Sequence, residues 1–134
     1  MSAFTRAEID YLQGQRLGRV ATVGPDGRPH VVPVGFRYNA ELETIDIGGH
    51  DFSKKKKFRD VLHNPAVALV VDDIASVDPW RVRGIEIRGD AEIVHAGGAE
   101  VMAGFDDAMF RITPRRVHSW GLGEGATVRS RSGA

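Results

Sequence analysis

The residues with the clearest potential for chemistry are four consecutive lysines, Lys54 to Lys57. Apolar residues follow them at helical spacing, which predicts a helix over 54–63 with Ser53 as its N-cap. Lysines in the first turn of a helix oppose its macrodipole by about 0.3–1 kcal/mol each. A phosphate or another anion would relieve this repulsion, because a helix N-terminus presents free backbone N–H groups. The alternative interpretation is a solvated helix face.

A glycine-containing loop, predicted over 48–53, comes immediately before the lysines. Gly48 and Gly49 would allow a flat ring to approach the backbone closely, although a simple loop with positive φ explains them equally well. His50 in this loop is a candidate ligand contact. A strand rich in valine, His30 to Phe36, precedes the loop in the sequence. The order of strand, glycine loop and lysine-rich helix predicts a site for a phosphate-bearing ligand with a flat ring.

The elements that must position these residues are predicted from turn signals and hydrophobic periodicity. Thr5 and Glu8 form a capping box that opens a short helix, and Gly14 ends it. Pro33 and Pro114 lie inside predicted strands and require an edge or a break in the pairing. The predicted strands cover 17–23, 30–38, 42–47, 66–71, 83–95 and 109–120, with a loop over 72–79 and a short helical or irregular excursion over 96–107.

The short strands and tight turns favour an antiparallel barrel over a parallel α/β sheet. The fold class is therefore mainly β with short helices. The 134 residues are expected to form a single domain over 1–134. Residues 122–134 are rich in glycine and arginine and are predicted to be a flexible tail.

Composition excludes several classes of protein. The 18 basic and 18 acidic side chains leave no net charge, which argues against a general nucleic-acid binder. The absence of cysteine excludes disulfides and thiolate metal sites, and the five histidines do not show metal-ligand spacing, so no metal is expected. No apolar run approaches the roughly 20 residues that would span a bilayer. Without a signal-peptide pattern at the N-terminus, a cytoplasmic location is expected.

Four segments of the chain, in this order and spacing, resemble a known family. They are DGRPH (26–30), KFRDVLHNP (57–65), PWRVRGIEIRG (79–89) and ITPRRVHSWG (112–121). The chain from about Arg19 to Trp120 resembles the pyridoxamine 5′-phosphate oxidase-like split barrels, and especially their deazaflavin (F420)-dependent branch. The resemblance implies a six-stranded antiparallel split β-barrel, FMN-binding-like, that forms a homodimer with its sites at the subunit interface.

The resemblance also assigns roles to residues of this chain. Lys57, with Lys55 or Lys56, is expected to contact the cofactor phosphate, and Ser53 to add a hydroxyl. Trp120 matches a tryptophan that such proteins direct at the ring bound by the partner subunit. The strand that is expected to line the cofactor comprises His30, Val31, Val32 and Pro33.

The function implied is an F420-dependent oxidoreductase that transfers hydride between the reduced cofactor and a small organic substrate. No catalytic side chain is expected, because the reactive atom belongs to the cofactor. Trp80 and Arg83 are candidate substrate neighbours, and Trp80 is alternatively an aromatic plug on the barrel. Vitamin B6 oxidase activity is not expected, since no Arg-Leu-His segment follows Trp120. The alternatives are an FMN-binding flavoprotein and a non-catalytic flavin-binding module.

Overall fold

The computed structural model describes residues 3–123 and 127–130, which form three α-helices, a 3₁₀ turn and seven strands. The helical elements are α1 (Arg6–Gly14), η1 (Phe52–Lys54), α2 (Lys56–His63) and α3 (Gly98–Val101). The strands are β1 (Leu17–Val23), β2 (Pro29–Asn39), β3 (Thr44–Gly48), β4 (Ala66–Ser76), β5 (Arg81–Val94), β6 (Met109–Trp120) and β7 (Thr127–Ser130).

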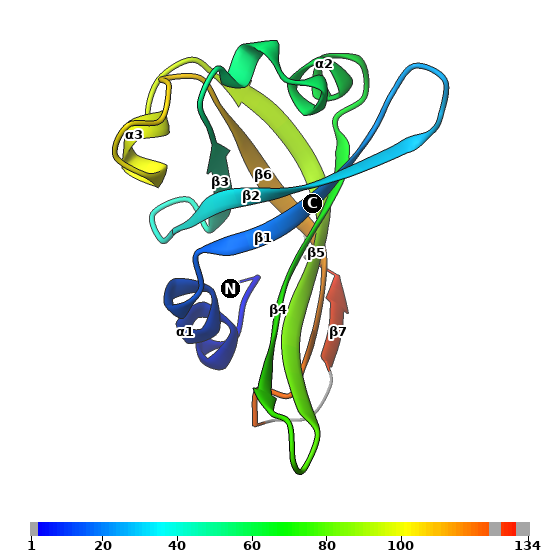
Figure 1. Ribbon diagram of the computed structural model, residues 1–134, viewed down its shortest axis with the longest axis vertical. Coiled ribbons are helices and arrows are strands. Elements are labelled where there is room, and N and C mark those ends of the chain that lie inside the picture. Colours follow the sequence, from blue (N-terminus) through cyan, green and yellow to red (C-terminus); the bar gives the residue numbers. More distant parts are fainter. Residues whose placement is uncertain (1–2, 124–126, 131–134) are drawn as a thin grey trace.

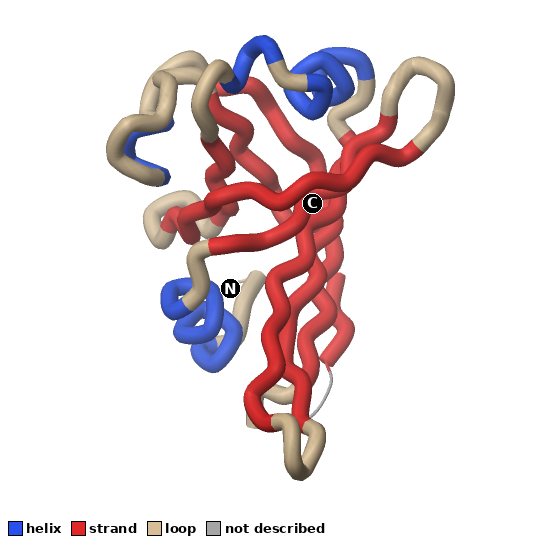
Figure 2. The backbone as a smooth tube through the Cα atoms, in the orientation of Figure 1, coloured by secondary structure: helices blue, strands red, loops and turns tan. Residues whose placement is uncertain are grey.

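Six of the strands close into an antiparallel barrel (Figures 1 and 2). Their order is β3-β2-β1-β4-β5-β6, and the first and last pair with each other through Ile45 to Ile47 and Phe110 to Ile112. This confirms the predicted mainly-β, six-stranded antiparallel barrel. The seventh strand was not predicted: β7 pairs with the end of β6, beyond the part of β6 that contacts β3. Part of the predicted flexible tail is therefore a strand, and residues 124–126 and 131–134 of this tail lie outside the described residues.

The interior of the barrel is apolar because inward-facing residues alternate with outward-facing ones along the strands. In Figure 1, α2 lies over the upper end of the barrel and α1 lies beside its lower part. Phe58 and Val61 of α2 and Leu12 of α1 belong to the same hydrophobic core. The predicted capping box of α1 is present, and its Glu8 is buried and accepts a hydrogen bond of 2.5 Å from the Ser119 hydroxyl. None of the described helices is long and apolar enough to cross a membrane.

Both strand prolines lie where the sequence predicted an edge or a break. Pro33 pairs with Arg19 of β1, but the pairing of β2 with β3 begins only at Gly35. Pro33 therefore lies in the part of β2 that has an open edge, where a missing N–H costs no ladder bond. Pro114 of β6 is the register partner of Gly89 of β5, at a register shift between the two strands.

The loop predicted over 72–79 was wrong for most of its length. β4 continues to Ser76 and β5 begins at Arg81, so that the two form a long hairpin that projects at the bottom of Figure 1. Asp73 and Arg83 face each other across this hairpin and form a two-bond ion pair, with N–O distances of 2.7 and 2.9 Å. Acidic residues are poor strand formers by themselves, and this cross-strand pair compensates for them. The strand predicted over 42–47 also begins later, at Thr44.

Candidate functional site

The lysine-rich helix begins two residues later than the sequence predicted. Ser53 is not the N-cap, because it lies inside the 3₁₀ turn η1, where the Lys54 and Lys55 N–H groups donate to the Asp51 and Phe52 carbonyls. The N-cap of α2 is Lys55, whose side chain makes no capping hydrogen bond, and no acidic residue lies in the first turn. The first backbone N–H groups of α2 therefore have no side-chain acceptor. An anion-binding site requires N–H groups that are free in this way.

The lysines at this helix start differ in their surroundings. Lys56 Nζ donates to the Asp60 carboxylate at 2.9 and 3.3 Å. Lys57 is half-buried, with its Nζ 5.3 Å from the centre of the Phe52 ring. Burial, and then the charge of Lys55, lowers the pKa of Lys57. Within residues 3–123, neither Lys55 nor Lys57 has a carboxylate ion-pair partner. Lys54 likewise has no such partner in this range, so Lys54, Lys55 and Lys57 are the lysines available to an anion.

The loop that leads to the helix is held by the excursion between β5 and β6. The Asp106 N–H donates to the Gly49 carbonyl at 3.0 Å, and the Asp106 carboxylate accepts from the Phe52 N–H at 3.0 Å. These bonds fix the backbone on both sides of His50. The predicted position of Ser53 close to the lysines is retained, although its hydroxyl is exposed and does not cap the helix.

A flat ring does pack on the glycines of this region, and it belongs to the protein. Gly48 of β3 pairs with Gly35 of β2, and the Phe105 ring lies over both. A Cβ atom added to Gly48 or Gly35 would lie 3.0 or 3.3 Å from this ring. His50 packs against the edge of Phe105, with ring centres 5.2 Å apart. Neither Gly48 nor Gly49 has positive φ, so the alternative prediction, a simple loop with positive φ, was wrong. Sequence reasoning missed Phe105, for which the facing glycines were the available signal.

The predicted cofactor strand divides into two faces. Val31 is 62% exposed and Pro33 is also exposed on the outer face of the barrel. Val32 packs against the hydrophobic core, and the His30 Nδ1 lies 3.9 Å from the Asp60 carboxylate of α2. The strand thus joins an exposed apolar surface to the lysine-rich helix.

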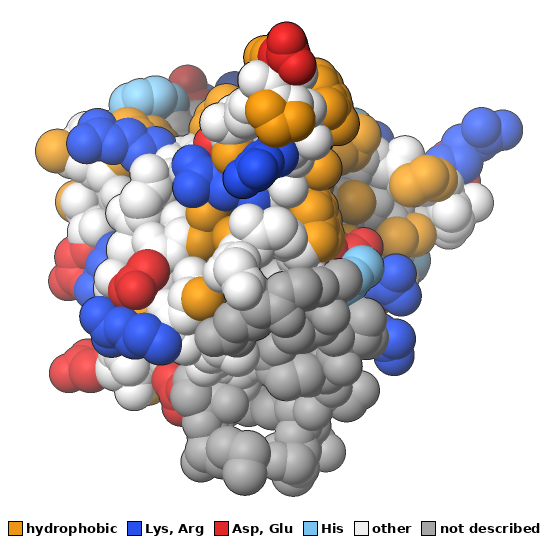
Figure 3. All heavy atoms as spheres, turned by 90° about the horizontal axis from the view of Figure 1, so that it is seen from below, with side chains coloured by type: hydrophobic (Ala, Val, Ile, Leu, Met, Phe, Trp, Pro, Cys, Tyr) orange, Lys and Arg blue, Asp and Glu red, His pale blue; other side chains and the backbone are white. Residues whose placement is uncertain are grey.

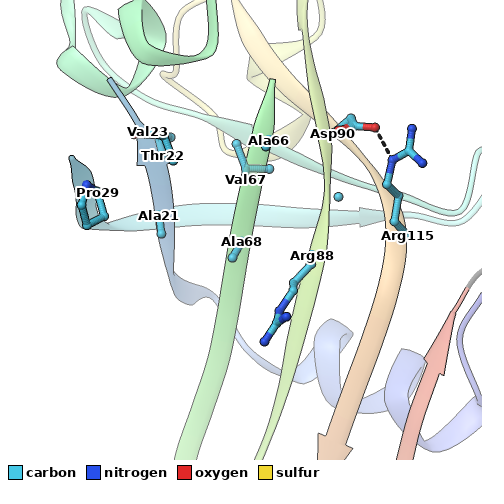
Figure 4. Close-up of a pocket in the computed structure, with 11 residues that line it drawn as sticks. Ala21, Thr22, Val23, Pro29, Ala66, Val67, Ala68, Arg88, Asp90 and Arg115 are labelled. Carbon is cyan, nitrogen blue, oxygen red and sulfur yellow. Dashed lines mark hydrogen bonds and ion pairs between the residues drawn. The ribbon is translucent and has the colours of Figure 1, made fainter. Parts of the chain in front are cut away.

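The outer face continues from Val31 into a hollow of about 370 Å³ on β1, β4 and β5 (Figure 4). Ala21 is the register partner of both Val31 and Ala68, so that small side chains form the floor. Arg88 and the ion pair of Arg115 with Asp90 lie at its border. The lining residues are Ala21, Thr22, Val23, Pro29, Ala66, Val67, Ala68, Arg88, Gly89, Asp90 and Arg115. The size and apolar floor suit a small organic ligand.

The remaining predicted contacts lie elsewhere in the chain. Trp80 is 64% exposed at the tip of the β4–β5 hairpin, so it is not an aromatic plug. Arg83 is engaged by Asp73, and its guanidinium lies 5.1 Å from the Tyr11 ring centre. Trp120 lies on Gly84 of the neighbouring strand. In Figure 1 the tip of this hairpin and α2 are at opposite ends of the molecule, so one chain does not bring Trp80 to the lysines.

The described residues contain no group of three or more histidine, cysteine, aspartate or glutamate side chains that could hold a metal ion. The features that the fold does assemble are the free lysines of α2, the glycine loop and the outward face of β2. This arrangement can bind an anionic group at one end and an apolar ring beside it.

Comparison with known proteins shows which family has this arrangement. The signature of the pyridoxamine 5′-phosphate oxidase family matches residues 4–121. A 5a,11a-dehydrotetracycline/5a,11a-dehydrooxytetracycline reductase from Streptomyces rimosus is 47% identical over 119 residues, which is 89% of this chain and 84% of that protein. A conserved hypothetical protein from Mycobacterium tuberculosis has the same fold, with a TM-score of 0.71 and 25% identity over 99% of this chain and 96% of its own.

An FAD-binding protein from Mesorhizobium loti shares the fold alone, with a TM-score of 0.65 and 19% identity over 95% of this chain and 96% of its own. The family match covers the whole barrel and both ends of the candidate site. From the barrel, the site and these similarities together, the chain belongs to the pyridoxamine 5′-phosphate oxidase family.

Proposed function

We propose that this protein is an F420-dependent reductase that transfers hydride to a small organic substrate. The observation that carries the proposal is the uncapped start of α2, where Lys55 and Lys57 lack carboxylate partners among the described residues, beside an exposed apolar strand. A phosphate-bearing cofactor with a flat ring fits both parts. The deazaflavin is preferred to FMN because its tail carries a phosphate and several glutamates, and the three lysines without a carboxylate partner among the described residues, Lys54, Lys55 and Lys57, exceed the need of one phosphate.

The proposed substrate class is a polycyclic compound with an electron-poor carbon–carbon double bond. The relative from Streptomyces rimosus is named for the reduction of 5a,11a-dehydrotetracyclines, which are compounds of this class. The small side chains of Ala21 and Ala68 leave a shallow apolar floor on which a flat molecule can lie.

The residues of this chain would bind and orient the cofactor and exclude water, and the reduced deazaflavin supplies the hydride when bound. Lys55, Lys57 and the N–H groups at the start of α2 would hold the phosphate. Val31 and Pro33 would lie against the ring and keep water from one of its faces. No side chain of the described part is assigned a proton-transfer step.

We further propose that the functional unit is a homodimer with its sites between the subunits. The outer face of β1, β4 and β5 and the hairpin tip carry large apolar side chains in contact with water, namely Leu17, Ile74, Val77, Trp80 and Val82, in addition to Val31 of β2. Hydrophobic side chains also gather in the upper part of the view in Figure 3. Contiguous apolar surface of this kind is typical of a protein interface. A second copy would bring its own Trp80, Arg83 and Trp120 toward the lysine-rich site.

The dimer is tested by placing a charge on this face. Val31→Asp should convert the dimer to a monomer and weaken cofactor binding by more than tenfold, because a carboxylate buried in an apolar interface is strongly unfavourable. Light scattering at micromolar concentration gives the mass. Leu42→Asp is the matched control, since Leu42 is 49% exposed in the turn between β2 and β3, outside the proposed interface. A wild-type monomer that binds cofactor tightly would contradict the shared site.

The choice of cofactor is tested by titrating fluorescence with F420 and with FMN at low and physiological salt. Binding of F420 should weaken more steeply with salt than binding of FMN, because salt screens the attraction between its carboxylates and exposed lysines. Replacing both Lys54 and Lys55 by Gln should weaken F420 binding more than FMN binding. If FMN binds more tightly at every salt concentration and this double change affects neither ligand, the protein is an FMN-binding flavoprotein.

Reduction of a dehydrotetracycline in the presence of reduced F420 is the test of activity. Tight cofactor binding without hydride transfer to any electron-poor alkene would favour the non-catalytic flavin-binding module.

A further inference from the structure

A buried carboxylate lies directly behind the proposed anion site. Asp60 of α2 is 2% exposed, and it accepts a hydrogen bond of 2.8 Å from the Thr22 hydroxyl of β1. It also accepts two hydrogen bonds from Lys56 Nζ, at 2.9 and 3.3 Å, and the Nδ1 atom of His30 lies 3.9 Å away. Burial by itself would raise the pKa of Asp60, but the hydrogen bonds from Lys56 and Thr22 outweigh burial and lower it. Asp60 is therefore a fixed negative charge within one helical turn of the lysines.

This pair determines the direction in which Lys56 extends. A Cβ atom added to Gly24, in the turn between β1 and β2, would lie 3.2 Å from both Lys56 Nζ and an Asp60 carboxylate oxygen. The Lys56 side chain thus runs along the helix toward that turn, away from the free N–H groups at the start of α2. Its charge is neutralised, while Lys55 and Lys57 remain without carboxylate partners among the described residues.

We propose that Asp60 is a specificity-determining residue that limits the positive charge of the anion site. With Lys56 held by Asp60, phosphate alone is bound weakly, and tight binding requires the ring to contact β2 as well. A site with all of its lysines free would bind any polyanion, because charge attraction has no shape selectivity. The inference rests on the proposed function, since it assumes that the phosphate of the cofactor lies at the start of α2.

The test compares FMN with riboflavin, which has the same ring and no phosphate. Asp60→Asn should release Lys56 and tighten FMN binding about tenfold, because one added charge in a largely hydrated site attracts the phosphate only modestly. The salt dependence of FMN binding should become steeper, whereas riboflavin affinity should not change. Asp46→Asn is the matched control, because Asp46 is also fully buried and paired with a cation, Arg111, which lies on β6. It should lower stability without changing either affinity.

The double variant Lys56→Met/Asp60→Asn isolates the charge effect and removes both partners of the pair. It should bind FMN with the wild-type affinity, because the net charge at the site is unchanged. If Asp60→Asn alone does not fold, this double variant still tests the proposal. If Lys56 contacted the phosphate directly, the double variant would instead lose about tenfold in FMN affinity, and the inference would be overturned.

The remaining outcomes separate the inference from the proposed function. FMN affinity that is unchanged or weaker in Asp60→Asn, together with a loss in Lys57→Met, overturns the role of Asp60 and leaves the anion site in place. FMN affinity that is unchanged in both variants places the phosphate elsewhere, and both the site and the inference then fail.

Discussion

Lys57→Met should weaken the binding of F420 and FMN by about 10- to 100-fold while the protein remains folded. Removing a charge-assisted hydrogen bond costs about 1.5–3 kcal/mol, and every 1.4 kcal/mol corresponds to a factor of about ten in affinity. Methionine keeps an apolar stem of similar length against the Phe52 ring, so the packing at this point is retained. Fluorescence titration of each cofactor measures the affinity, and circular dichroism checks the fold.

The fold should tolerate this change because Lys57 is an unfavourable cation in the free protein. Burial and the neighbouring charge of Lys55 lower the pKa of Lys57, which means that the folded state disfavours its charged form. A bound phosphate would compensate for this cost and raise the pKa again. Lys57→Arg is the control, since it preserves the charge and should retain most of the affinity. If Lys57→Met leaves the cofactor affinity unchanged, Lys57 does not bind the phosphate and belongs to a solvated helix face.

Asp46→Ala should lower the free energy of unfolding by about 3–5 kcal/mol, the range found when one partner of a buried ion pair is removed. Asp46 is fully buried in β3 and accepts two hydrogen bonds from Arg111 of β6, at 3.1 and 3.3 Å. It also accepts a bond of 3.1 Å from the Asn39 side chain. Because β3 and β6 close the barrel, the uncompensated Arg111 charge would lie at the closing seam.

Urea denaturation followed by circular dichroism gives this loss directly. The control is Asp90→Ala, which removes the partner of Arg115 at an exposed ion pair and should cost about 1 kcal/mol or less. Equal losses in the two variants would show that the Asp46 pair contributes no more than a surface pair does.

The local elements of the barrel could be predicted from the sequence because their signals are local. The alternation of Ile85 and Ile87 with Glu86 and Arg88 is enough to define a strand with one buried face. The capping box of α1 and the turn at Gly24 to Gly27 are likewise carried by residues three positions apart, and both are present in the structure. Ser53 shows the limit of such signals, because the 3₁₀ turn that displaces it depends on the Asp106 contact from a distant segment.

The sequence by itself determined the six strands of the barrel, their antiparallel arrangement and the presence of a lysine-rich helix start after a glycine loop, since neighbouring residues specify these features. It did not determine the extension of β4 to Ser76 or the strand β7. Only the tertiary structure decided which lysines are free. Lys56 and Asp60 are four residues apart on α2, as a local helical pair requires, but Asp60 is buried and held in place because α2 packs it against Thr22 of β1, 38 residues away in the sequence. The same holds for Phe105, because its ring lies on Gly35 and Gly48, which are both far from Phe105 in the sequence. The charges and surfaces of the site depend on contacts between remote segments, and the burial that creates those contacts has no local pattern.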